Sequence, residues 1–96
     1  MGFYIITYDL RTPGQDYTEL YNAIKALGEW QHPLESVWFL YTDDVNVDSN
    51  YIYQRLRPCI DNNDFLFINR LNPDDKQGWM VKSFWNWYNS ILDRTN

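Results

Sequence analysis

Apolar residues along this chain fall into strand-like and helix-like runs separated by short polar segments. Phe3–Leu10, FYIITYDL, is almost entirely β-branched or aromatic, which is typical of a central strand covered on both faces. Ser36–Thr42, SVWFLYT, and Phe65–Leu71, FLFINRL, predict two further long strands. Glu29–His32 predicts a short strand, because the following Pro33 suits a turn or an edge position.

Three other segments show the apolar spacing of helices. The first is expected from about Tyr17 to Leu27, since Asp16 precedes Glu19 at the spacing of a capping box. Gly28 then supplies a left-handed stop.

The second helix is expected to begin near Asn46 or Asp48 and to be kinked or ended by Pro58. The third is expected over about 79–93. One face of this third helix carries Val81, Phe84, Trp85, Tyr88 and Leu92, and Trp87 and Ile91 widen it.

The predicted order is strand, helix, strand, strand, helix, strand, with a helix added at the end. Right-handed connections convert this order into a ferredoxin-like βαββαβ α+β domain with both main helices on one face of the sheet. We expect residues 1–96 to form one such domain, with its core at about 3–71 and an aromatic C-terminal helix at about 79–93.

Aromatic residues make up 19% of the chain, which is more than one small core easily hides. Because Tyr and Trp are enriched at interfaces, we expect some of them to meet a partner, and a homodimer would bury them. The aromatic helix either completes the core over an open sheet face or forms half of a dimer contact. The interface candidates are Trp38, Trp79, Trp85, Trp87 and Tyr88.

The formal net charge is −5, which disfavours nucleic acid as a partner because duplex binding relies on Lys and Arg. A single cysteine, Cys59, excludes an internal disulfide and fits a reducing compartment. The sequence contains no recognisable signal peptide and no apolar stretch as long as a membrane span. These features predict a cytoplasmic protein with no membrane contact.

Asp9 is the residue best placed for chemistry, since it ends the central strand, where open sheets tend to bind ligands. One carboxylate does not hold a divalent cation alone, so a metal site here would need a second Asp9 from a two-fold partner or a loop residue. In the simpler alternative, Asp9 accepts hydrogen bonds from the loop at 11–15 and ends the strand.

Other polar residues have structural explanations at least as good as functional ones. His32 could exchange protons near neutral pH, but it sits in a turn beside a proline and is more simply a hydrogen-bonding residue. Cys59 is expected to pack in the core. Asp61 and Asp64 lack the glycine and distal glutamate of a calcium loop and are explained by turn chemistry.

The chain resembles the small ferredoxin-like CRISPR-associated protein that partners the spacer integrase. The matching positions are Tyr8, Asp9, Gly28, Gln31, Ser36, Val37 and, approximately, Trp38. The segments LGEW, HPLESVW and IY..LRP..D.ND look still more like small bacterial and phage proteins often labelled SinR-like, and the VapD ribonuclease toxins resemble the chain more distantly. By this resemblance, Asp9 would bind metal opposite its mate in a homodimer.

The sequence favours a non-catalytic interaction module that forms a homodimer and binds a protein partner of unknown identity, with no cofactor. The alternative is a nuclease dependent on Mg or Mn, with Asp9 of each chain as catalytic residue and metal ligand. A third possibility is a phage or mobile-element inhibitor of host defence, because an acidic surface can occupy a nucleic-acid channel.

Overall fold

The structure, a computed structural model, describes residues 2–95, with the backbone alone for Thr95. Its elements have the order predicted from the sequence, and a short 3-10 turn follows the second helix. The bounds are β1 Gly2–Asp9, α1 Thr18–Lys25, β2 Glu29–Leu34, β3 Val37–Thr42, α2 Ser49–Leu56, η1 Arg57–Cys59, β4 Phe65–Arg70 and α3 Lys82–Thr95. The expected α+β class is confirmed.

The four strands form one antiparallel sheet in the order β2-β3-β1-β4. β1 is therefore an inner strand, as its uninterrupted apolar run predicted. Pro33 lies within β2 at the edge of the sheet, where a missing backbone N–H is tolerated, and the register with β3 is irregular between Gln31 and Leu34.

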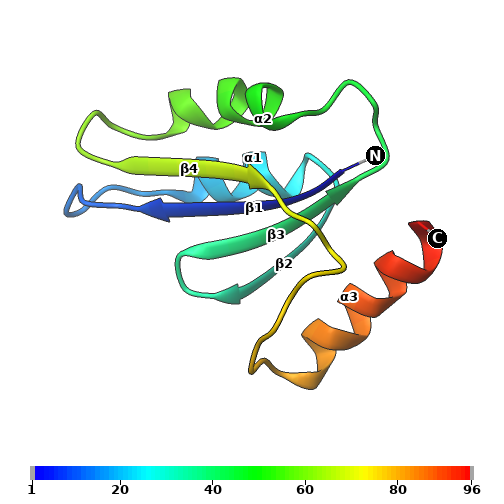
Figure 1. Ribbon diagram of the computed structural model, residues 1–96. Helices are drawn as coiled ribbons and strands as arrows, with labels where there is room; N and C mark the ends of the chain where they lie inside the picture. The colour runs from blue at the N-terminus through cyan, green and yellow to red at the C-terminus, as the bar shows by residue number, and fades with distance from the viewer. Residues whose placement is uncertain (1, 96) are drawn as a thin grey trace.

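Alternate residues of β1 serve two separate cores, because successive side chains of a strand point to opposite faces. Tyr4, Ile6 and Tyr8 lie in the first core, between the sheet and helices α1 and α2. Figure 1 shows α1 and α2 on one side of the sheet and α3 on the other. The first core contains Tyr4, Ile6, Tyr8, Leu20, Ile24, Trp38, Leu40, Val47, Ile52, Leu56 and Ile60.

The aromatic helix α3 covers part of the opposite sheet face of its own chain. The second core consists of Phe3 and Tyr41 from the sheet with Phe84, Tyr88 and Ile91 from α3. The helix therefore completes the core of the chain, which was one of the two roles left open by the sequence. Its 14 residues make α3 the longest helix described, and none of the helices within residues 2–95 is long and apolar enough to cross a membrane.

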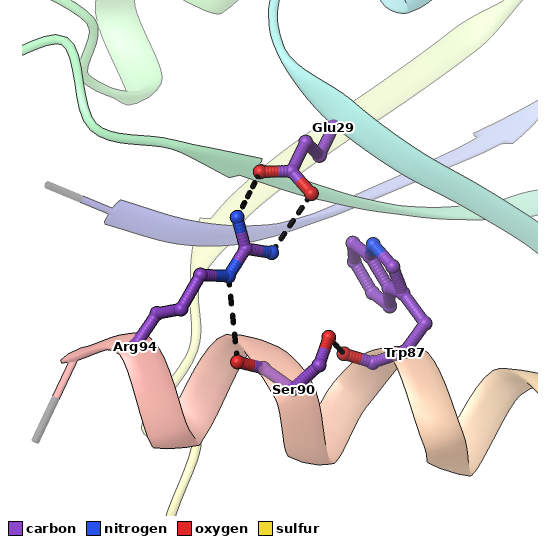
Figure 2. A network of polar contacts seen from close by, with 4 residues as sticks. All are labelled: Glu29, Trp87, Ser90 and Arg94. Atoms are coloured by element: carbon purple, nitrogen blue, oxygen red, sulfur yellow. Dashed lines mark hydrogen bonds and ion pairs between the residues drawn. The ribbon is translucent and has the colours of Figure 1, made fainter.

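Polar contacts hold the middle and the C-terminal end of α3. The guanidinium of Arg94 donates to both carboxylate oxygens of Glu29 on β2, over 2.7 and 2.8 Å (Figure 2). This hydrogen-bonded pair lowers the pKa of the Glu29 carboxyl. In the middle of the helix, the Tyr88 hydroxyl donates to the carbonyl of Pro73 over 2.9 Å.

Three local predictions require correction. The third helix begins at Lys82 and not near Trp79, because Met80 packs against the second core from a non-helical connection. Asp16 accepts hydrogen bonds from the backbone and hydroxyl of Thr18, and the N-cap position is Tyr17. Gly28 has no left-handed backbone, since among residues 2–95 only Gly14 has a positive φ.

Close packing, and not a left-handed backbone, explains why residue 28 is a glycine. A Cβ at this position would collide with the carbonyl oxygen of Tyr41, so the start of β2 can approach β3 only if residue 28 has no side chain. The prediction for the second helix was accurate: Asp48 accepts a hydrogen bond from the backbone N–H of Tyr51, and Pro58 lies in the 3-10 turn that follows α2.

Candidate interaction surface

The sheet face beneath α3 is covered along only part of its length. Residues paired across neighbouring strands form rows on this face, and α3 covers the row of Phe3 and Tyr41. The next row places Ile5 opposite Phe39 of β3. The following row is formed by Thr7, with Val37 and Phe67 on either side of it. Of the residues in these last two rows, only Phe39 packs against the second core. The cover provided by α3 therefore stops about halfway along the strands.

Beyond α3 the face is apolar and exposed. Phe65 is 57% exposed, Phe67 63% and Leu34 48%, and the half-buried Thr7 and Val37 lie between β2 and β4 in the same surface. We call these five residues the open half. Monomeric proteins rarely leave large contiguous apolar patches in water, and such patches commonly mark interaction sites.

A cavity of about 570 Å³ lies where the open half meets the covered half. Its floor includes Ile5 and Phe39 of the sheet, and Leu34 connects it to the open half. Its wall is formed by the 71–80 segment and by the aromatic residues Phe84 and Trp85 of α3. The volume is in the range of ligand-sized pockets.

Asp9 lies at the border of the open half, opposite Phe65 in the register of β1 and β4. Its carboxylate is exposed and accepts hydrogen bonds from Arg11, with the closer contact at 2.7 Å. The Arg11 guanidinium also lies over the Phe65 ring, 4.8 Å from its centre. Within residues 2–95 no three His, Cys, Asp or Glu side chains are grouped as a metal site would require. The charged neighbour of Asp9 in this chain is a cation.

Asp64 has a larger structural role than its polar sequence context suggested. It is 6% exposed and accepts hydrogen bonds from the backbone N–H of Arg11 and Asp61 and from the hydroxyls of Tyr17 and Thr12. Burial by itself would raise the pKa of the Asp64 carboxyl, but the hydrogen bonds outweigh burial and lower that pKa. Asp64 thereby positions the loop that follows Asp9.

His32 and Cys59 have structural contacts. The His32 ring stacks on Trp38 with 4.0 Å between centres, and its Nε2 lies 3.0 Å from the carbonyl oxygen of Glu35. Since the carbonyl can only accept, Nε2 is the donor in this contact. Burial, with a smaller contribution from Glu19, raises the pKa of the Cys59 thiol, which disfavours the reactive thiolate.

The five aromatic interface candidates have very different exposures. Trp38 and Tyr88 are each 2% exposed and belong to the first and second cores, respectively. Trp85 and Trp87 are half-buried against the second core. Trp79 is fully exposed in the segment before α3. Of the five, Trp79 is the one whose whole side chain is available to a partner.

No family model and no curated protein matches this chain. Among solved structures, the chain is similar to a hypothetical protein, TT1823, from Thermus thermophilus. The TM-score is 0.59 at 23% sequence identity, and the match covers 83% of this chain and 94% of the other. At this identity the likeness shows a shared α+β fold.

Proposed function

We propose that this protein is a non-catalytic interaction module that forms a homodimer through the open half of its sheet. The observation that carries the proposal is the pair of exposed phenylalanines on β4, Phe65 at 57% and Phe67 at 63%, on a face that α3 leaves uncovered. A second copy placed on the same face would remove these rings from water. An isologous contact of this kind is the commonest arrangement in soluble oligomers.

We also propose the finer fold assignment. The order of elements through β4, with α1 and α2 packed on one face, supports a ferredoxin-like domain. The Tyr8-Asp9 pair at the end of β1 supports a relationship to the CRISPR-associated family that the sequence resembles. In this proposal, α3 is an addition that covers half of the second sheet face.

Replacing Phe67 with Arg tests the dimer. Phe67 is exposed, so Phe67→Arg leaves the folded chain intact, but a dimer would bury two unpaired cations. Light scattering and sedimentation should give a dimer mass for the wild type and a monomer mass for the variant. The matched control is Val45→Arg, because Val45 is 84% exposed and lies outside the open half; this variant should remain dimeric.

A wild-type chain that is monomeric at high concentration would contradict the proposal. So would a Phe67→Arg chain that dimerises as well as the wild type. Circular dichroism of each variant separates loss of association from loss of fold.

The position of Asp9 favours a second candidate function, a metal-dependent nuclease. Asp9 borders the open half opposite Phe65, so a two-fold contact over this surface would bring the Asp9 residues of two chains toward one another. Two carboxylates could then bind Mg or Mn and activate a water molecule for attack on a phosphodiester. The Arg11 cation would have to release Asp9 first.

Incubation of labelled DNA and RNA with manganese, and with chelator, tests this alternative. A nuclease predicts cleavage by the wild type that chelator and Asp9→Ala both abolish, while the variant stays folded and dimeric. Asp93→Ala, at an exposed carboxylate on α3, is the control and should cleave normally. Cleavage that persists in Asp9→Ala would assign the activity to a contaminant or another residue.

A further inference from the structure

Trp79 lies beside the cavity at the edge of the open half but forms no part of its lining. Its two neighbours in the chain, Gly78 and Met80, both line the cavity, whereas the Trp79 side chain is 100% exposed. A fully exposed tryptophan is costly in water, and tryptophan is the residue most enriched at the energetic centres of interfaces. An unfilled apolar cavity and an exposed aromatic ring therefore occur next to each other.

The cavity suits an aromatic occupant. Phe39, Phe84 and Trp85 supply ring surfaces to its lining, with 4.9 Å between the Phe39 and Phe84 ring centres and 5.3 Å between those of Phe84 and Trp85. Both of these pairs are edge-to-face, the arrangement that aromatic rings favour. An added indole would extend a cluster of this kind.

We propose that the occupant is Trp79 of a second copy, inserted reciprocally. Trp79 of each chain, which we call the anchor, would enter the cavity of the other chain, which we call the socket. This inference rests on the proposed homodimer. A two-fold contact requires that if a residue of one chain meets a site on its partner, the partner's equivalent residue meets the same site on the first. An anchor and a socket within one patch satisfy this requirement.

The apolar area available agrees with a dimer. With 150–250 Å² for each aromatic side chain, the exposed parts of Trp79, Phe65 and Phe67 together offer roughly 400 Å². A standard interface buries about 800 Å² on each partner, so these three rings would supply about half of it. The charges are also self-complementary, because Asp75 and Lys76 both line the cavity and a two-fold contact can bring opposite signs together.

The first test removes the anchor. Trp79→Ala should keep the folded structure and thermal stability of the isolated chain, because the side chain has no burial to lose. It should raise the dissociation constant of the dimer roughly tenfold or more, as measured by sedimentation. Trp79→Phe should retain part of the affinity, and Val45→Ala should behave as the wild type.

The second test separates the anchor from the socket. Asn69 is an exposed residue of β4 that lines the cavity, so Asn69→Trp should fill the socket from its own chain. Each variant alone then has no complete anchor–socket pair. In a mixture, Trp79 of the Asn69→Trp chain can enter the empty socket of the Trp79→Ala chain. Native mass spectrometry of an equal mixture should therefore find a heterodimer share well above the half that random mixing gives.

The outcomes distinguish this inference from the proposed function. If the wild type and Trp79→Ala dimerise equally while Phe67→Arg does not, the homodimer stands and the insertion of Trp79 is wrong. A heterodimer share no greater than random mixing would overturn the insertion as well. If the wild type is monomeric at all concentrations, the homodimer and the insertion both fail.

Discussion

At the scale of single residues, the carboxylate of Asp64 organises the loop that leads from β1 to α1. It accepts hydrogen bonds from Arg11, Thr12 and Tyr17, which lie about fifty positions earlier in the chain, and from nearby Asp61. The sequence placed Asp64 in a polar turn, where it does lie, but a turn signal carries no information about a partner so distant along the chain.

The stability of the protein should fall in acid partly through Asp64. Because the folded state lowers the pKa of this carboxyl, its contribution is fully present above the unfolded pKa of about 3.9 and is lost as the pH falls below that value. Asp64→Asn should be less stable than the wild type at neutral pH, with the difference shrinking toward about pH 2.

Urea unfolding from neutral to acidic pH measures this difference. Asp93→Asn is the control, because Asp93 is exposed and should leave the pH dependence unchanged. A constant difference between Asp64→Asn and the wild type across the pH range would contradict the assignment, since it would mean that the ionised carboxylate is not what stabilises the loop.

For Asp9, in contrast to Asp64, the sequence predicted both the position of the residue and its contacts within the chain. Its position at the end of the central strand was predicted correctly. The sequence-based alternative in which Asp9 accepts hydrogen bonds from the following loop agrees with its contacts to Arg11. Its proposed metal role depends on a second chain, so the contacts within one chain leave that role as a prediction.

At the scale of elements, α3 shows how the second sheet face is divided. Its apolar stripe was predicted from helical spacing, and Phe84, Tyr88 and Ile91 from that stripe pack against the sheet. The stripe alone did not reveal whether the helix covers its own sheet or another, because both solutions bury the same residues. In the structure, the 72–81 connection brings α3 back against β1 and β3 of its own sheet, on the side opposite α1 and α2 (Figure 1).

Truncating the centre of this contact should destabilise the protein strongly. Phe84 is 2% exposed, and Phe84→Ala should cost about 3–5 kcal/mol of unfolding free energy through lost burial and a residual cavity. Val81→Ala is the matched control, since Val81 is 66% exposed in the preceding turn and should cost less than about 1 kcal/mol.

Denaturant unfolding at low protein concentration, where the chain is monomeric, is the appropriate measurement. Equal effects of Phe84→Ala and Val81→Ala under these conditions would show that α3 does not pack on its own sheet. A strong effect of Phe84→Ala that appears only at high concentration would instead place the helix across a dimer contact.

At the scale of the whole molecule, one central sheet separates two cores of different character. The first combines aliphatic residues of two amphipathic helices with three aromatic residues of β1 and β3, Tyr4, Tyr8 and Trp38. The second is mainly aromatic and covers only the rows of the sheet nearest the start of β1. This asymmetry leaves the open half, and with it the proposed surface for a second copy.

The order of the elements, the central position of β1 and the limits of α2 could be predicted from the chain alone, because these depend on local propensity, alternation and capping. Asp64 as a loop anchor, the close approach at Gly28 and the division of aromatic residues between core and surface were decided by tertiary structure. These features depend on contacts between residues distant in the chain, and local patterns do not encode such distances. The same reason explains why Trp38 and Trp79, both named as interface candidates from the sequence, are at opposite extremes of exposure in the folded protein.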